Sequence, residues 1–318
     1  MEKLAVITSA EVGKPTFPAL EGLLDIAYSI DSSVADVLNG ASMVFLWDAS
    51  LAGELGESWE KAGCSAGWLH VAVTGIDGLC TEQLRKAGTV LTNSAGIYDD
   101  AIAEYVLAAC LGYERKLALL RDQQREHRWS WLQGGLLKGG NVLVVGPGRI
   151  GRACARLFRA LGCNVAALGT RSKPCDELFD FIDSSASIAK RIGWADHIVV
   201  TAPLTKETYH LIGADALASC KISAHLVNVG RGAIVDTAAL EQALADGLLG
   251  GVTLDVLEEE PLKSDSPLWG MDNVVITPHI AGDAGDFEQF LIRQFESNAL
   301  KWLAGEPLDG TVDLGRGY

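Results

Sequence analysis

The run Gly146-Pro147-Gly148-Arg149-Ile150-Gly151 follows the apolar stretch 141–145 and precedes a helix-like segment that extends through Leu161. A strand, a glycine-rich turn and a helix in this order open a dinucleotide-binding unit. The first glycine makes the tight turn, the second lets the backbone approach a pyrophosphate, and the third lets helix and strand pack closely. The helix N-terminus offers N–H groups to the phosphates. We therefore predict a dinucleotide site formed by Gly146, Gly148, Arg149, Ile150 and Gly151.

The second half of a NAD fingerprint is missing. A NAD-binding unit carries Asp or Glu about 20 residues further on, where it binds the ribose 2′-hydroxyl. Here the strand-like stretch 164–168 runs into Gly169-Thr170-Arg171-Ser172-Lys173, and the next carboxylate is Asp176. Arginine binds phosphate bidentately, whereas a carboxylate would repel it. We expect NADP(H) as the preferred cofactor and NAD(H) as an acceptable one, with Arg171 and Ser172 at the 2′-phosphate and Thr170 beside them. A solvated basic turn is the alternative.

The 318-residue chain has a formal net charge of −15, which argues against nucleic acid and anionic membranes as partners. No apolar run reaches the ~18 residues of a membrane span, and Met1-Glu2-Lys3 leads into a short strand without a signal-peptide pattern. The seven cysteines lack CxxC and Cys/His ligand spacing, so we expect thiols in a reducing cytoplasm and no metal site. Five histidines without a partner pattern are expected to be structural or exposed: His70, His127, His197, His210 and His225.

Short runs rich in Val, Ile and Leu alternate with helix-length segments along the chain. This alternation is typical of parallel sheets covered by helices on both faces. The early runs are 4–8, 25–30, 43–48, 69–74 and 89–92, and the later runs are 141–145, 165–168, 197–201, 225–229, 251–254 and 274–277. The two series predict two doubly wound α/β domains.

Two long helical patterns, 99–120 and 286–303, flank the second series. If the first leads into the nucleotide domain and the second leads out of it, the C-terminal helix returns to the first domain. We therefore predict a Rossmann nucleotide-binding domain at 99–283, inserted into a discontinuous flavodoxin-like substrate domain made of 1–98 and 284–318. The first series lacks a phosphate-binding glycine turn, which favours the substrate role for that domain.

Three polar residues follow apolar strands of the second series. Arg231 stands between two glycines, Glu260 ends the acidic run 258–260, and His279 comes directly after Thr277-Pro278. The carboxyl ends of parallel strands form the edge where open α/β sheets bind ligands. Arginine can bind a carboxylate and polarise an adjacent carbonyl, and histidine can exchange a proton while a glutamate orients its ring. Reduction of a 2-keto acid requires these groups.

The ordered motifs resemble the D-isomer-specific 2-hydroxyacid dehydrogenases over about residues 69–283. They are Val73-Thr74-Gly75-Ile76-Asp77, Ala103-Glu104, the Gly146 turn, Pro203-Leu204-Thr205, Asn228-Val229-Gly230-Arg231-Gly232, Leu254-Asp255-Val256, Glu260-Pro261 and Thr277-Pro278-His279. The resemblance implies that Arg231 binds the 2-keto acid, with His279 as acid/base and Glu260 as its partner. It also implies that backbone amides of Thr74, Gly75 and Ile76 hold the substrate carboxylate. Asp255 is expected at the nicotinamide amide, Pro203 and Val229 at the cofactor, and the nucleotide domain at a homodimer interface.

Within that family the sequence looks most like the short glyoxylate/hydroxypyruvate reductases. The supporting features are the Thr170-Arg171-Ser172 turn, the Ser266-Pro267-Leu268-Trp269 run and Trp47 at the end of an early strand. Trp47 is either a wall of the substrate pocket or an ordinary core aromatic. The N-terminal 50 residues match no motif, which leaves the substrate more open than the reaction type.

Other roles remain open for several residues. Arg231 could be a structural cation, although its two flanking glycines favour close approach of a ligand, and His279 alone could be a core histidine. Glu258 and Glu259 compete with Glu260 as the partner of His279. The alternatives to NADPH-dependent reduction of glyoxylate or hydroxypyruvate are a dehydrogenase of another 2-hydroxy acid, such as lactate or phosphoglycerate, and a non-catalytic nucleotide-sensing interaction protein.

Overall fold

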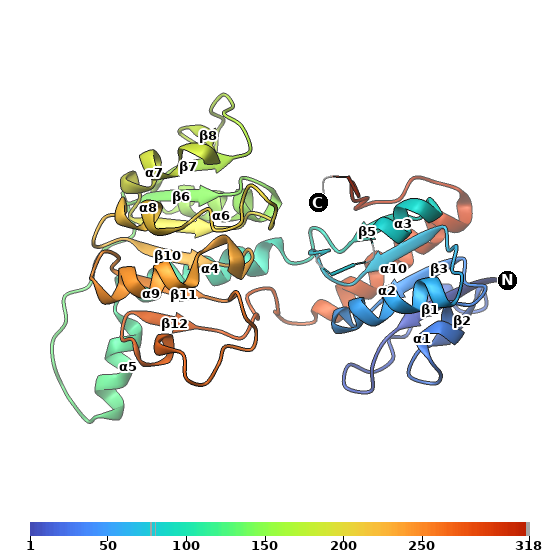
Figure 1. The fold of residues 1–318 in the computed structure, drawn as a ribbon. Coiled ribbons are helices and arrows are strands. Elements are labelled where there is room, and N and C mark those ends of the chain that lie inside the picture. Colours follow the sequence, from blue (N-terminus) through green and yellow to red (C-terminus); the bar gives the residue numbers. More distant parts are fainter. Residues whose placement is uncertain (77, 80, 316–318) are drawn as a thin grey trace. The chain divides into compact units, whose positions relative to one another are not determined.

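The computed structural model describes residues 1–76, 78, 79 and 81–315, and the chain divides into two compact units (Figure 1). Unit 1 comprises Met1–Tyr98 and Gly285–Tyr318, and unit 2 comprises Asp99–Ala284. Asp77, which closes one of the family motifs, and Cys80 lie outside the described residues. Each unit contains a parallel sheet, so the prediction of two parallel-sheet α/β domains is confirmed.

The sheet of unit 1 is parallel throughout. Its strands are β1 (Glu2–Ile7), β2 (Leu24–Tyr28), β3 (Met43–Leu46), β4 (Trp68–Val71) and β5 (Val90–Asn93), and its helices are α1 (Val34–Leu38), α2 (Ala52–Lys61), α3 (Thr81–Ala87) and α10 (Phe287–Ala304). The strand order β2-β1-β3-β4-β5 is the flavodoxin-like order. Alternate residues of β3 face opposite sides, so Phe45 packs in a core with α10 while Val44 packs in a core with α1, α2 and α3.

An aromatic cluster explains why the C-terminal helix belongs to unit 1. The ring of Phe295 on α10 stacks on Phe45 at 4.2 Å between centroids and on Trp68 at 5.2 Å. Phe45 and Trp68 come from neighbouring strands and are fully buried, as is Phe295. Burial of these large rings holds α10 against the sheet, although most of unit 1 lies almost 200 residues earlier in the chain.

The sheet of unit 2 is also parallel and contains the glycine turn. Its strands are β6 (Asn141–Val145), β7 (Asn164–Gly169), β8 (Ile182–Ser184), β9 (His197–Val200), β10 (His225–Asn228), β11 (Gly251–Leu254) and β12 (Val274–Ile276), in the order β12-β11-β10-β9-β6-β7-β8. The helices of unit 2 are α4 (Asp99–Glu114), α5 (Leu117–Arg125), α6 (Arg149–Ala160), α7 (Ile188–Arg191), α8 (Ala214–Ala218) and α9 (Thr237–Ala245). One core joins the sheet to α4 and α6, and a second joins its other face to α7, α8 and α9. The chain order reverses between β6 and β9, which is where such a sheet binds its ligand.

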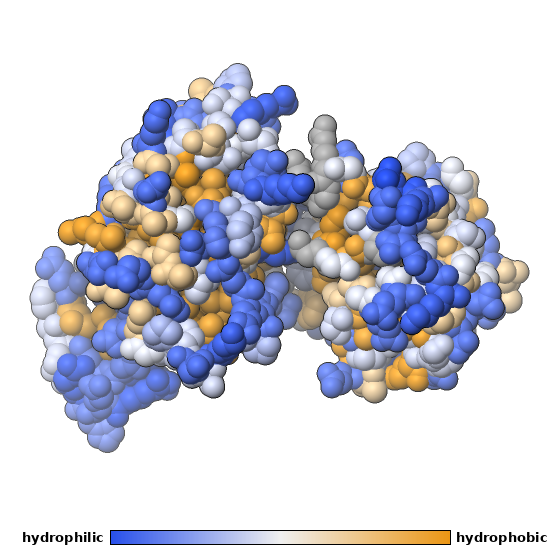
Figure 2. Space-filling view, in the orientation of Figure 1, coloured by the Kyte–Doolittle hydropathy of each residue, from blue (hydrophilic) through white to orange (hydrophobic). Residues whose placement is uncertain are grey.

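The predicted helix 99–120 is interrupted. Lys116 adopts a left-handed backbone with φ +55°, so α4 ends at Glu114 and α5 begins at Leu117. Figure 1 shows α5 and the chain after it reaching away from the sheet of unit 2, and Figure 2 shows hydrophilic side chains over α5. Within the described part of the chain, no helix is both long and apolar enough to cross a membrane.

Candidate active site

The glycine turn after β6 serves packing at two positions and leaves space at the third. Gly146 has φ +102°, and a Cβ there would lie 2.6 Å from the backbone of Ala202. A Cβ at Gly151 would overlap the carbonyl oxygen of Gly146. A Cβ at Gly148 would meet nothing within 4 Å. Gly146 and Gly151 are therefore required by the turn and by helix packing, while Gly148 leaves open space where a ligand can approach the backbone.

The first turn of α6 presents backbone N–H groups. Gly148 is its N-cap, no side chain caps the helix, and the N–H of Arg152 donates to the Gly148 carbonyl. The N–H groups at the start of the helix, up to that of Gly151, have no carbonyl one turn earlier within the helix to accept them. The Arg149 side chain pairs with Asp99 at 3.1 Å, and Ile150 packs against the core. Arg149 and Ile150 thus offer a ligand their backbone rather than their side chains.

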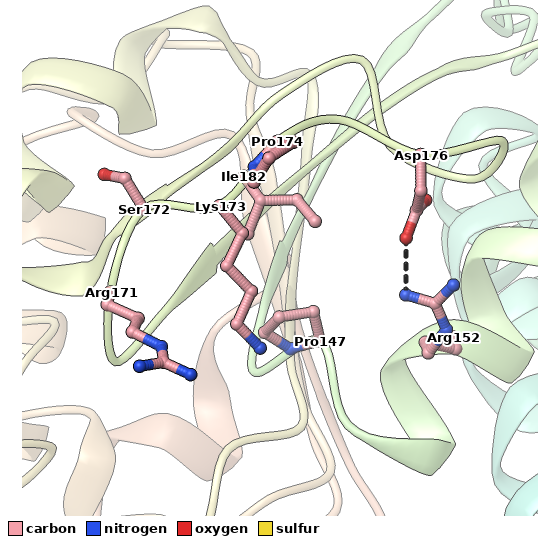
Figure 3. A pocket seen from close by; sticks show the side chains of 8 residues that line it. All are labelled: Pro147, Arg152, Arg171, Ser172, Lys173, Pro174, Asp176 and Ile182. Carbon is pink, nitrogen blue, oxygen red and sulfur yellow. Dashed lines mark hydrogen bonds and ion pairs between the residues drawn. The ribbon is translucent and has the colours of Figure 1, made fainter.

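A basic pocket of about 550 Å³ lies beside this turn (Figure 3). Its lining residues are Pro147, Arg152, Arg171, Ser172, Lys173, Pro174, Asp176 and Ile182. In Figure 3 the Lys173 amino group ends beside Pro147, with the Arg171 guanidinium projecting on the same side of the pocket. Asp176, across the pocket, is held by Arg152 at 2.8 Å. The lining therefore carries three cations and one carboxylate that is already paired.

The basic turn itself is held by its neighbours. Ser172 Oγ accepts the N–H of Ser184 at 3.1 Å and lies 3.5 Å from the Asp183 carboxylate, and Thr170 is exposed. Arg171 makes no ion pair within the described part of the chain. Ser172 therefore fixes the turn, and Arg171 and Lys173 supply its positive charge. Lys173 was not predicted at this site, because its position in the pocket depends on the path of the chain after the turn.

Arg231 lies three residues beyond the end of β10. The side chain of Asn228 closes this turn, because its Nδ2 donates to the Arg231 carbonyl at 3.1 Å and its Oδ1 accepts the N–H of Gly230 at 3.1 Å. Arg231 Nη1 donates to the carbonyl of Gly230 at 2.8 Å. The strand end and the Asn228 side chain therefore fix the backbone from which the guanidinium projects.

The two glycines beside Arg231 have a different cause from the one expected. A Cβ at Gly230 would lie 2.8 Å from the carbonyl oxygen of Ala202, and a Cβ at Gly232 would overlap the backbone of Leu257. Neighbouring loops therefore require both glycines. Close approach of a ligand at Arg231 stays a prediction, because packing alone accounts for the two glycines.

His279 pairs with Glu260. His279 Nδ1 lies 2.8 Å from Glu260 Oε2, and the other Glu260 oxygen accepts the N–H of Leu257 at 2.9 Å. The two side chains are 54% and 38% exposed, so a solute can reach them. With Nδ1 donating to Glu260, Nε2 is the ring atom left to exchange a proton.

The two competing glutamates have other partners. Glu258 lies 2.6 Å from His210 Nε2 and accepts the N–H of Thr237 at 2.8 Å. Burial opposes its ionisation, but the hydrogen bonds from Thr237 and His210 outweigh this effect and lower the pKa of Glu258. Glu259 pairs with Lys263 at 2.7 Å on the surface. Of the three glutamates, Glu260 is the one that the structure brings against His279.

Asp255 organises the turn that carries His279. Its Oδ1 accepts the Thr277 hydroxyl at 2.6 Å and the Ile280 N–H at 2.9 Å, and its Oδ2 accepts the Ala281 N–H at 2.9 Å. The Asp255 carbonyl accepts the N–H of His279, which has φ +56°. Asp255 is only 3% exposed. Both carboxylate oxygens thus hold the turn that carries His279. The sequence predicted a nicotinamide contact for Asp255 and did not predict this structural role.

Pro203 and Val229 lie beyond β9 and β10, at the same sheet edge as the glycine turn. Val229 is buried and its N–H donates to Val200 at 3.1 Å. Pro203 is exposed, and its carbonyl accepts the Thr208 hydroxyl at 2.7 Å. Pro203 is therefore accessible to a ligand, whereas Val229 mainly continues the core.

The predicted substrate residues of unit 1 follow β3 and β4. Thr74, Gly75 and Ile76 form the loop after β4, where the Thr74 carbonyl accepts Asn93 Nδ2 at 2.7 Å. Thr74 Oγ1 is buried without a hydrogen-bond partner among the described residues. Trp47 is 8% exposed and packs edge-on against Phe45. Its burial favours the second of its two expected roles, that of a core aromatic.

Comparisons with known proteins identify the family of this chain. Residues 107–281 match the model for the D-isomer specific 2-hydroxyacid dehydrogenase NAD-binding domain. This chain belongs to the D-isomer specific 2-hydroxyacid dehydrogenase family. It is 34% identical over 242 residues to the glyoxylate reductase of Thermofilum pendens, covering 73% of this chain and 70% of that one. It is 34% identical over 245 residues to glyoxylate/hydroxypyruvate reductase B of Yersinia pestis, covering 75% of each.

A solved relative covers both units. The 2-hydroxyacid dehydrogenase of Xanthobacter autotrophicus, in complex with NADPH and MES, is 27% identical, with a TM-score of 0.82 and full coverage of both chains. The family consists of oxidoreductases that use NAD(P). The present protein is therefore an enzyme of that class. The resemblance inferred from the ordered motifs is confirmed.

Proposed function

We propose that this enzyme reduces a small 2-keto acid, glyoxylate or hydroxypyruvate, to the D-2-hydroxy acid with NADPH. The observation that carries the cofactor preference is the pair of cations, Arg171 and Lys173, at the end of the second strand of the nucleotide unit. The names of the Thermofilum and Yersinia relatives support the substrate, and the NADPH complex of the Xanthobacter relative supports the cofactor.

The cofactor fits the residues present. Gly148 leaves open space beside the N–H groups of α6, which suits a pyrophosphate. A 2′-phosphate suits Arg171 and Lys173, because Asp176, the acidic residue of this pocket, is already neutralised by Arg152. NADPH supplies a hydride when it is bound there.

The residues of unit 2 supply the remaining chemistry. We assign His279 Nε2 as the donor of the proton that the carbonyl oxygen receives, with Glu260 holding the ring through Nδ1. Arg231 binds the substrate carboxylate and polarises the adjacent carbonyl, and its bond to the oxygen strengthens as negative charge develops there. From unit 1 we assign the backbone amides of Thr74, Gly75 and Ile76 to the substrate carboxylate.

The cofactor preference is tested by Arg171→Ala. Loss of a charge-assisted bond to phosphate costs about 1.5–3 kcal/mol, so the KM for NADPH should rise about 10- to 150-fold while that for NADH changes little. Arg125→Ala on α5, which removes an arginine with a 69% exposed side chain outside the pocket, is the matched control. Equal increases for both cofactors would refute the assignment of Arg171.

The substrate is tested with a panel of 2-keto acids under NADPH oxidation. Glyoxylate and hydroxypyruvate should give the highest kcat/KM. Preference for pyruvate, a bulkier acid or a phosphorylated one would assign the enzyme to another substrate of the same reaction type.

We also propose that the enzyme is a homodimer joined through unit 2. The support is an exposed apolar segment after α5, in which Trp129, Trp131 and Leu136 are 103%, 82% and 73% exposed. Side chains of this kind are costly to leave in water and mark interaction surfaces. Light scattering coupled to gel filtration should give twice the chain mass, and Trp129→Ala with Trp131→Ala should shift it toward the monomer.

We place the enzyme in the cytoplasm, supported by free thiols at the described cysteines.

A further inference from the structure

Three potential metal ligands meet at the amino-terminal edge of the sheet in unit 2. His197 and His225 are the first residues of β9 and β10 and are paired in register, and Cys110 reaches them from α4. One ligand atom from each of the three side chains lies within 4.8 Å of the other two. All three residues are buried, at 0–1% exposure.

Hydrogen bonds occupy one ring nitrogen of each histidine. His197 Nε2 lies 3.1 Å from Glu114 Oε1, and His225 Nε2 lies 3.0 Å from Thr253 Oγ1. The Nδ1 atoms of both rings are buried without any partner among the described residues. A buried polar atom left unpaired costs about 1–3 kcal/mol, so two of them in one three-residue cluster call for an explanation.

The hydrogen bonds of the two imidazoles favour the tautomer that binds a metal. If Glu114 and Thr253 accept the Nε2 protons, each Nδ1 presents a lone pair. A metal-bound histidine typically donates its other N–H to a carboxylate, as His197 can to Glu114.

We propose that Cys110, His197 and His225 bind one Zn²⁺ ion. Two imidazoles and a thiolate are ligands that zinc accepts, with a fourth position left for water. The Cys110 thiolate and the Glu114 carboxylate together balance the two positive charges of the ion. Zinc bond lengths of about 2.0–2.3 Å place ligand atoms roughly 3.3–3.6 Å apart, and the three atoms now lie within 4.8 Å of one another, so they approach by up to about 1.5 Å on binding.

A pocket of about 350 Å³ borders the cluster at His225. It is lined by residues of α4, α5 and the strands β10 to β12, including His225, Thr253 and Tyr113, and the Tyr113 ring stacks flat on His225 at 4.3 Å. The cluster lies at the opposite end of the strands from Arg231 and His279, which follow the carboxyl ends of β10 and β12. The proposed ion is therefore structural and joins α4 to the sheet. The sequence did not predict it because its ligands have no local spacing.

The test uses the full chain, stripped with a chelator and reloaded. Wild-type protein should bind one equivalent of Co²⁺ with a thiolate-to-cobalt charge-transfer absorption, and Zn²⁺ should displace it and raise the melting temperature. Cys110→Ala should abolish the absorption. Cys154→Ala, which removes another fully buried thiol of the same core, is the matched control and should keep it. Glu114→Gln should weaken Zn²⁺ binding about 10- to 100-fold.

The wild-type measurement alone can overturn the proposal. Absence of a thiolate absorption with Co²⁺ would leave a buried water molecule as the group that pairs the two Nδ1 atoms. An absorption that survives in Cys110→Ala would assign the metal to another thiol. Loss of the absorption in Cys154→Ala as well as in Cys110→Ala would equally refute the assignment of Cys110 as the ligand.

Discussion

Asp255→Asn separates two roles for a buried carboxylate. The family resemblance implies that Asp255 contacts the nicotinamide amide, whereas the structure engages both of its oxygens with the turn that carries His279. The asparagine side chain has the same shape but replaces one acceptor oxygen by a donor. In one orientation the new NH₂ group faces the N–H of Ala281, and in the other it faces the N–H of Ile280. One backbone donor is unpaired in either case.

The magnitude follows from these contacts. An unpaired buried N–H costs about 1–3 kcal/mol, and the bonds that remain lose the extra strength of a charged acceptor, roughly 0.5–1 kcal/mol each. The sum is about 3 kcal/mol. For a unit of this size, 1 kcal/mol shifts the melting temperature by about 2–4 °C, so unit 2 should melt about 6–12 °C lower. A displacement of about 1 Å at His279 would reduce kcat on the order of 10²-fold.

The assay combines thermal denaturation with steady-state kinetics in NADPH and glyoxylate. If Asp255 holds the turn, Asp255→Asn lowers the melting temperature and kcat and leaves the KM for NADPH within about threefold of wild type. Asp283→Asn is the matched control, because Asp283 lies near the same turn and is exposed. An unchanged melting temperature together with a large rise in the KM for NADPH would refute the positioning role and favour direct contact with the cofactor.

Three further predictions concern the proton donor, the carboxylate site and the core of unit 1. Arg231→Lys keeps the charge but loses the two-pronged geometry of the guanidinium. The kcat/KM for glyoxylate should therefore fall at least about 10²-fold, about 2.7 kcal/mol, while NADPH binding is unchanged. Near wild-type kinetics would disprove the assignment of Arg231 to the substrate carboxylate. In single-turnover assays, His279→Ala should lower kcat about 10²–10⁴-fold, and Glu260→Gln should lower it less, about 10-fold. A larger loss in Glu260→Gln than in His279→Ala would contradict the assignment of His279 as the proton donor and Glu260 as its partner. Burial lowers the pKa of His70 from 6.5 to about 3, so only the unfolded chain binds this proton between those values and the free energy of unfolding falls with pH below 6.5. At pH 4.5 this lowers the free energy of unfolding by about 2.7 kcal/mol, and urea titrations should show that His70→Asn removes most of this pH dependence. An equal loss of stability in the wild type and in His70→Asn would exclude His70 as its source.

Much of the fold could be predicted because its signals are local. Runs such as 141–145 and 251–254 are mostly apolar, which is typical of strands covered on both faces, and they coincide with β6 and β11. The short strand β8 was not predicted, because its three residues pair with β7 at the edge of the sheet and carry a weak apolar signal. The break between α4 and α5 was also missed. It depends on the left-handed backbone of Lys116, a residue type that gives no warning of it.

The candidate site could be predicted in part, because several of its residues follow strands directly. Arg231, Asp255 and His279 come after neighbouring strands, so their sequence positions bring them to one sheet edge. The neighbours of the site residues could not be predicted in the same way. Choosing Glu260 over Glu258 and Glu259 requires the path of the loop after β11, and finding Lys173 in the basic pocket requires the path after β7. Such paths depend on contacts distant in sequence.

The glycines show that one motif residue can have more than one structural reason. Gly148 and Gly232 both belong to family motifs and both stand beside residues with a predicted role in binding. At Gly148 a Cβ would enter open space, whereas at Gly232 it would overlap the backbone of Leu257. The first glycine is therefore free to serve a ligand, and the second is required by the fold. A sequence contains the glycine in each case but not the neighbour that requires it, so its function can be assigned only when the space around the missing Cβ is known.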